Sequence, residues 1–378
     1  MGPVVLKFST ADSEEDSVTV AGDATEVNLV QMDIRTIDIA PLSGLRNLER
    51  LTLSENPIMD IDLTPLASCS RLKELCLRWD QLEKIDLRPL KHCSELLELD
   101  VSSNILETID LSPLSECPRV RDLYLSGNSM SSVDLSPLRE CANLRYLGLT
   151  HNVLQDIDLS PLAQCSSLVY LGLTSNEIGR VDLEPLRNCK SLKRFEMERN
   201  RLTSVDLAPM GSCRSLEYLN LRGNSLAEIE LAPLSGHSSL RYLVLSQNQI
   251  QKISLAPLAE CRSLEEVLLD CNRLTRIDLS PLGACTGISE ISLGENALRT
   301  IDLSPLEGLQ QLRVIDLHDN PMAKVDTTPL FGCPKLKTLD VNRSTPGRAV
   351  SLRADKSFQA RESVPRAIHD VWDRIEWE

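Results

Sequence analysis

The chain has 378 residues with a formal net charge of −15 at pH 7, and only 3% of its residues are aromatic. The core must therefore be aliphatic, and nucleic acid is excluded as a partner because such a ligand requires a basic surface. No apolar run approaches the roughly 20 residues that span a bilayer. The first residues also lack a charged flank, an apolar stretch and a cleavage site. We expect an intracellular, cytoplasmic protein that does not bind membranes.

One six-residue phrase, Ile-Asp-Leu-Ser-Pro-Leu at residues 109–114, recurs every 24 residues in thirteen copies from Ile37 to Val325. Repetition at a fixed period is the signature of a solenoid, in which each unit packs on its neighbours. The second position of the phrase is acidic in twelve copies, and Ser254 is the exception. Removing these acids would change the net charge from −15 to −15 + 12 = −3, so most of the charge belongs to one structural column.

Each unit is expected to contain one short strand and one short helical turn. Leu123 and Leu125 alternate with polar neighbours, as in a half-buried strand. In the return phrase, Val133 and Leu135 are predicted to point inward. Ser136 is suited to cap a helical turn, and Pro137 to the first helical position. Because alanine replaces this serine in some copies, we also hypothesise that the acid two residues earlier accepts N–H bonds from the turn.

Two further columns are interpreted as structural. Asparagine follows eleven of thirteen strands, with Asp80 replacing it once, and its amide can satisfy backbone groups of adjacent coils. Ten of twelve cysteines occupy one inward column that is elsewhere leucine or histidine, which indicates free, buried thiols in a reducing compartment. The outliers, Cys76 and Cys271, are the thiols that we expect a labelling reagent to reach first.

Caps are expected at both ends of the array, residues 26–341, because a solenoid end exposes an apolar cross-section. Residues 1–25 contain two strand-like stretches, Val4 to Phe8 and Ser17 to Val20, and form the predicted N-terminal cap. A disordered acidic tail is the alternative. Residues 342–378 form the predicted C-terminal cap, an irregular connection followed by a helix over about 364–375. Trp372 and Trp377 are large enough to cover the last coil.

The unit around Leu123, Leu125, Asn128 and Met130 resembles the leucine-rich repeat, whose pattern is L-x-x-L-x-L-x-x-N-x-L over 20 to 29 residues. The Pro-Leu pair is similar to that of internalin-like repeats, the 24-residue spacing to plant-type units, and the cysteine column to prokaryotic cytosolic arrays. The resemblance implies an α/β solenoid, a horseshoe with a concave parallel sheet of about 14 strands and short helical or 3₁₀ turns on the convex side. It also implies a protein-binding concave face and no reaction.

Functional information is expected at the outward strand positions, which the repeat leaves variable. All five tyrosines occupy two of these columns, and tyrosine and arginine commonly anchor interfaces. The predicted partner-binding residues are Tyr124, Tyr146, Tyr170, Arg194, Glu196, Tyr218, Arg222, Tyr242, Val244 and Leu268. Acidic residues on both flanks favour a protein or peptide partner with an apolar centre and basic ends.

We therefore expect a monomeric protein-interaction module or scaffold. One alternative is a non-catalytic regulatory subunit or modulator of an enzyme, such as a phosphatase or GTPase regulator of leucine-rich type. Another is that the stacked tyrosines only brace the exposed sheet. The five histidines lie in different columns and no nucleophile, phosphate-binding or metal motif is evident. We expect no enzymatic activity, metal or cofactor, and His318-Asp319 is the nearest approach to a catalytic pair.

Overall fold

The computed structural model describes residues 2–342, 350–358 and 364–378. The chain folds into two compact units, Met1–Leu192 and Lys193–Glu378. Each unit is built from the same 24-residue coil, so the same physical arguments apply to both.

Each unit contains seven of the fourteen strands of the parallel sheet, all three residues long, which confirms the predicted number. In the first unit these are β3 (Glu26–Asn28), β5 (Arg50–Thr52), β6 (Glu74–Cys76), β7 (Glu98–Asp100), β8 (Asp122–Tyr124), β9 (Tyr146–Gly148) and β10 (Tyr170–Gly172). In the second they are β11 (Arg194–Glu196), β12 (Tyr218–Asn220), β13 (Tyr242–Val244), β14 (Glu266–Leu268), β15 (Glu290–Ser292), β16 (Val314–Asp316) and β18 (Thr338–Asp340). Equivalent residues pair across neighbouring strands, as Tyr146 does with Tyr170.

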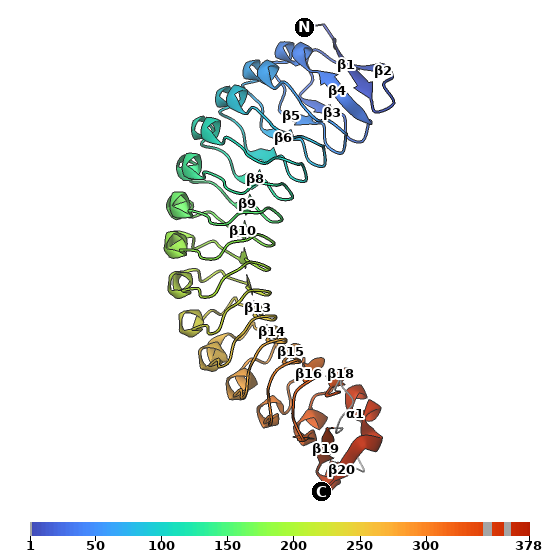
Figure 1. The fold of residues 1–378 in the computed structure, drawn as a ribbon, viewed down its shortest axis with the longest axis vertical. Helices are drawn as coiled ribbons and strands as arrows, with labels where there is room; N and C mark the ends of the chain where they lie inside the picture. The colour runs from blue at the N-terminus through green and yellow to red at the C-terminus, as the bar shows by residue number, and fades with distance from the viewer. Residues whose placement is uncertain (1, 343–349, 359–363) are drawn as a thin grey trace. The chain divides into compact units, whose positions relative to one another are not determined.

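Short helices form a row separate from the strands within each unit (Figure 1). The predicted short turns are confirmed as 3₁₀ helices of three or five residues. Those of the first unit are η1 (Ala40–Gly44), η2 (Thr64–Ser68), η3 (Arg88–His92), η4 (Ser112–Glu116), η5 (Ser136–Glu140), η6 (Ser160–Gln164) and η7 (Glu184–Asn188). Those of the repeats in the second unit are η8 (Ala208–Ser212), η9 (Ala232–Leu234), η10 (Ala256–Glu260), η11 (Ser280–Ala284), η12 (Ser304–Leu306) and η13 (Thr328–Gly332).

The acidic column begins these helices. Asp110 Oδ1 accepts the backbone N–H of Ser112 at 2.9 Å, and all twelve acids of the column make the equivalent bond. The hypothesis for these acids is confirmed. The prediction that the serine caps the turn is wrong, because Ser112 is already the first helical residue and Leu111 holds the cap position without a side-chain bond. A side chain two residues before the N–H reaches it more readily.

The interior follows the predicted columns with one exception. Leu123 and Leu125 are fully buried, and so are all ten cysteines of the inward column. The Asn128 amide donates to the carbonyls of Val101 and Leu125 at 3.1 and 3.2 Å, which confirms the bridging role of asparagine between coils. Val133 is only half-buried, so it does not point fully inward as predicted.

The N-terminal residues form an antiparallel sheet of β1 (Val4–Thr10), β2 (Glu15–Val20) and β4 (Ile34–Asp38) in the order β2-β1-β4. Both stretches that were predicted as strands are therefore strands. The third strand, β4, comes from the return stretch of the first coil. This coil has no preceding repeat, so β1 supplies the hydrogen-bond partners that a neighbouring coil would otherwise provide.

At the other end, β17 (Lys324–Asp326), β19 (Ser351–Ala354) and β20 (Ile375–Trp377) form a second small sheet. The single helix predicted over 364–375 is wrong in extent. The structure has α1 (Arg366–Asp370), then η15 (Trp372–Arg374), then β20, and η14 (Lys356–Phe358) precedes them. Parts of the predicted irregular connection, 343–349 and 359–363, lie outside the described residues.

The rings of Trp372 and Trp377 pack near Phe331, with centroids 6.2 and 6.1 Å away, as expected for residues that cover the last coil. No helix within residues 2–342, 350–358 and 364–378 has the length and hydrophobicity needed to cross a membrane.

Candidate functional site

The open face of the first unit carries three tyrosines from adjacent strands. The ring centroids of Tyr146 and Tyr170 are 4.3 Å apart with 9° between their planes, and Tyr124 lies 4.5 Å from Tyr146 in a tilted arrangement. All three side chains are half-buried. Parallel pairing brings equivalent positions side by side, so one outward column yields a continuous aromatic stack. We call these residues the first tyrosine group.

Glycines leave room for these rings. A Cβ added at Gly172 would lie 2.6 Å from Tyr170 Cε1, and one added at Gly148 would lie 3.0 Å from Tyr146 Cε1. Each ring therefore lies along its own strand, over the glycine two residues further on. A side chain at either position would displace the ring beside it. The stack also gives the bracing alternative a physical basis, because the rings contact one another.

The open face of the second unit carries Tyr218 and Tyr242, whose ring centroids are 5.7 Å apart. The Arg194 guanidinium lies 4.0 Å from the Tyr218 ring centroid, a cation–π distance. The Tyr242 hydroxyl donates to Glu265 at 3.0 Å, which fixes the orientation of its ring. We call Arg194, Tyr218 and Tyr242 the second tyrosine group.

The remaining predicted site residues all belong to the second unit and differ in their exposure. Glu196 pairs with Arg194, and Leu268 is half-exposed on β14. Arg222 is half-buried, and its Nε has no hydrogen-bond partner among the described residues. Val244 is only 5% exposed, so it offers little surface to the partner that it was predicted to bind. Three of the ten predicted residues belong to the first unit and seven to the second.

Acidic residues flank both tyrosine groups. Partial burial raises the pKa of Glu98 in the first unit, and the negative charges of Glu74, Asp122 and Asp100 raise it further. Burial, followed by nearby acids, raises the pKa of Glu290 in the second unit. A positively charged partner group at these positions would relieve the repulsion.

The described residues contain no group of three or more histidine, cysteine or acidic side chains arranged to hold a metal ion. His318 lies close to two acids other than Asp319, its neighbour in the sequence. Its Nδ1 lies 2.6 Å from Asp316 Oδ1 and its Nε2 3.6 Å from Glu295 Oε1. The bond to Asp316 raises the pKa of His318.

Sequence reasoning did not single out Trp79, and it noted Asp80 only as a replacement in the asparagine column. Trp79 is 64% exposed at a turn of the first unit, and Asp80, which replaces the column asparagine, is only 6% exposed. The sequence contained a signal for both, because Trp79 is the only aromatic residue in a column of mainly polar residues and Asp80 is the only acid in the asparagine column.

Comparison with known proteins places these features in a family. The profile described as leucine rich repeat matches six overlapping segments that together cover residues 70–322, more than half of the chain. No match to a curated protein was found.

Solved structures share the fold. An internalin of Listeria monocytogenes is 25% identical with a TM-score of 0.70, and the alignment covers 88% of this chain and 91% of that chain. A leucine-rich-repeat protein of Leptospira interrogans is 18% identical with a TM-score of 0.74, covering 94% and 96%. The plant peptide hormone receptor RGFR1, solved in complex with RGF2, is 18% identical with a TM-score of 0.64, covering 90% and 60%. The chain belongs to the leucine-rich repeat family.

Proposed function

We propose that this chain is a non-catalytic interaction module that binds a protein or peptide through the open face of its parallel sheet. The observation that carries the proposal is the placement of all five tyrosines, half-exposed, on this face. Tyrosine offers a large, rigid contact area at low entropic cost, and Arg194 adds a charged anchor on Tyr218. The family supports this use, since a plant peptide hormone receptor of the same fold was solved in complex with RGF2.

The proposed partner has an apolar or aromatic centre and basic ends. The tyrosine rings provide the apolar contact. Glu98 in the first unit and Glu290 in the second are carboxylates that burial and neighbouring acids hold in an unfavourable state. A lysine or arginine of the partner would be attracted to them, and this attraction would weaken with salt.

The test replaces Tyr146, Tyr170, Tyr218 and Tyr242 by serine in one variant and uses the native chain to capture a partner from cell extract. The partner is then identified by mass spectrometry and its affinity measured by calorimetry with both chains. Removing four aromatic anchors should reduce the affinity at least about a hundredfold, since anchors of this type commonly contribute more than 2 kcal/mol each. Val153→Ser is the control, because Val153 is an exposed apolar residue, 42% exposed, that lies outside both tyrosine groups.

Two outcomes would contradict the proposal. Unchanged affinity of the tyrosine variant would show that the partner binds elsewhere. A large fall in melting temperature would favour the bracing role of the stacked rings.

We also propose the cytoplasm as the location. The twelve cysteines are free, ten of them buried in one column, which is the form that a reducing compartment maintains. Cell fractionation followed by immunodetection tests this.

A further inference from the structure

A cleft of about 640 Å³ lies at the turns of the first three coils, apart from both tyrosine groups. Its lining includes Gln31, Asp33, Glu55, Pro57, Trp79 and Gln81. These residues come from the turns that follow β3, β5 and β6, together with Ala11 of the N-terminal sheet. The cleft is therefore a feature of the first unit alone, where the repeats meet the cap.

Trp79 is the most unusual residue of this cleft. It is 64% exposed, more than any other large hydrophobic residue in the described part of the chain. Its φ of 59° also places it in the left-handed region, which bulky side chains rarely adopt. Neighbouring repeats place Glu55, Ser103 and Gly127 at the equivalent position. Neither burial nor backbone geometry explains a tryptophan here. The exposed indole ring is therefore a candidate contact for a ligand.

The charge of the cleft is one-sided. Its lining contains Asp33 and Glu55 and no basic residue. Asp33 is exposed and makes no ion pair or side-chain hydrogen bond within the described ranges. Glu55 accepts from the Gln31 amide and forms an ion pair with Arg78 at 3.6 Å, so Asp33 is the carboxylate of the cleft without a partner. An unpaired carboxylate beside an exposed indole attracts a cation.

Among biological cations, the guanidinium group fits this combination best. It is planar and stacks on aromatic faces, tryptophan being the strongest partner, while its N–H groups bind carboxylates. Two large apolar residues of the same unit are also exposed, Met59 at 42% and Ile105 at 48%.

We propose that this cleft binds an arginine side chain of a protein partner, with the guanidinium stacked on Trp79 and hydrogen-bonded to Asp33 and Glu55. The site is separate from the tyrosine groups, so it adds a second contact to the interaction module.

Nuclear magnetic resonance of the full chain tests this directly. The indole N–H signal of Trp79 is assigned by its loss in Trp79→Phe, and the native chain is titrated with acetyl-Gly-Gly-Arg-Gly-Gly-amide. We expect a saturable shift with a dissociation constant in the millimolar range, because the site offers one cation–π contact together with charge-assisted hydrogen bonds to carboxylates. The same peptide with neutral citrulline should leave the signal in place. The signals of Trp372 and Trp377 should not move with either peptide.

Matched variants distinguish binding in the cleft from a general attraction of the peptide to the acidic protein. Asp33→Asn should weaken the arginine peptide about fivefold or more, since it removes the unpaired carboxylate. Asp60→Asn should leave the affinity unchanged, because Asp60 is an exposed acid of the same unit that does not line the cleft. Three results would overturn the proposal. The Trp79 signal does not shift at about 10 mM arginine peptide, the citrulline peptide shifts it equally, or both variants weaken binding equally. None of these results depends on the tyrosine groups, so the two proposals fail separately.

Discussion

The backbone N–H of Asn56 donates to Asp80 Oδ1 at 2.9 Å, whereas Asp80 Oδ2 is buried and has no hydrogen-bond partner among the described residues. At the same position one coil later, the Asn104 amide donates to the carbonyls of Leu77 and Val101 at 2.8 and 3.1 Å. An ionised carboxylate cannot donate to such carbonyls, but a protonated one can. Burial raises the pKa of Asp80 to about 7, and the Asn56 N–H opposes this only in part.

The first prediction concerns the dependence of stability on pH. Asp80 has a pKa of 3.8 as a free group and about 7 in the folded chain, so between these values the folded state holds a proton that the unfolded state releases. The free energy of unfolding should therefore fall as pH rises from about 4 to about 7, by on the order of 4 kcal/mol. Asp80→Asn should remove this fall and be more stable than the native chain at pH 7.5. Urea unfolding across this pH range measures it.

Other carboxyls with raised pKa values, such as Glu98, titrate in both chains, so the informative quantity is the difference between the two curves. Asp62→Asn is the control. The hydrogen bonds from Thr64 lower the pKa of Asp62, so its contribution is present above its unfolded pKa and is lost as pH falls. Parallel curves for Asp80→Asn and the native chain would show that Asp80 is ionised in the fold.

The repeat made most of the fold predictable because each column has a constant direction. Leu123, Asn128 and Asp134 all have the contacts that their columns predicted. The repeat period does not determine how exposed a residue is, because exposure depends on the neighbouring side chains. Val244 is buried for this reason, and the protonation of Asp80 depends on burial that the sequence alone does not measure. The cleft at Trp79 was not predictable from one column, since its lining comes from three turns and the cap.

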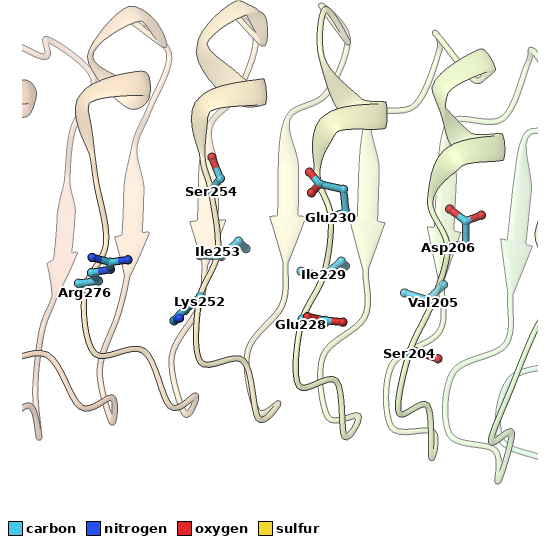
Figure 2. A pocket seen from close by; sticks show the side chains of 10 residues that line it. All are labelled: Ser204, Val205, Asp206, Glu228, Ile229, Glu230, Lys252, Ile253, Ser254 and Arg276. Carbon is cyan, nitrogen blue, oxygen red and sulfur yellow. The ribbon is translucent and has the colours of Figure 1, made fainter.

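The second prediction concerns the interruption of the acidic column. Ser254 stands where neighbouring coils have Asp206 and Glu230, at the side of a groove of about 710 Å³ (Figure 2). Its hydroxyl accepts the Ala256 N–H at 3.4 Å, compared with 2.9 Å for the bond from Ala232 to Glu230. Ser254→Asp should shorten this bond and raise the free energy of unfolding by about 0.5–1 kcal/mol. Urea unfolding at pH 7 measures the change.

Ser204→Asp provides the control, because Ser204 lines the same groove but lies outside the acidic column. It should leave stability within about 0.5 kcal/mol of the native chain. A loss of stability in Ser254→Asp would mean that repulsion from Glu230 exceeds the gain from the new hydrogen bond.

The third prediction concerns the glycine beneath the aromatic stack. In Gly172→Ala the new Cβ would collide with the Tyr170 ring, which must then rotate away from its strand. The stack with Tyr146 should be disrupted, with a changed near-ultraviolet circular dichroism spectrum and weaker partner binding. Because the ring end can move, the loss of stability should stay below about 2 kcal/mol.

Gly179→Ala is the matched control for this prediction, since a Cβ at Gly179 would meet no atom within 4 Å. Its spectrum and partner affinity should equal those of the native chain. If Gly172→Ala binds the partner normally despite a changed spectrum, the first tyrosine group is not part of the interface.

The fourth prediction concerns the two outlying cysteines. Cys76 and Cys271 are half-buried, whereas the ten column cysteines are buried. A maleimide at pH 8 should therefore modify Cys76 and Cys271 first. The reaction should still be slow, because burial and nearby acids raise the pKa of both thiols to about 12. Since the thiolate is the reactive form, we expect rates roughly a hundred- to a thousandfold below that of an unperturbed thiol, with all twelve cysteines reacting in urea.

Mass spectrometry of digested protein identifies the modified sites, and Cys76→Ser and Cys271→Ser should each remove one of them. Rapid modification of any column cysteine in the native chain would show that the coils open locally, contrary to the packing described above.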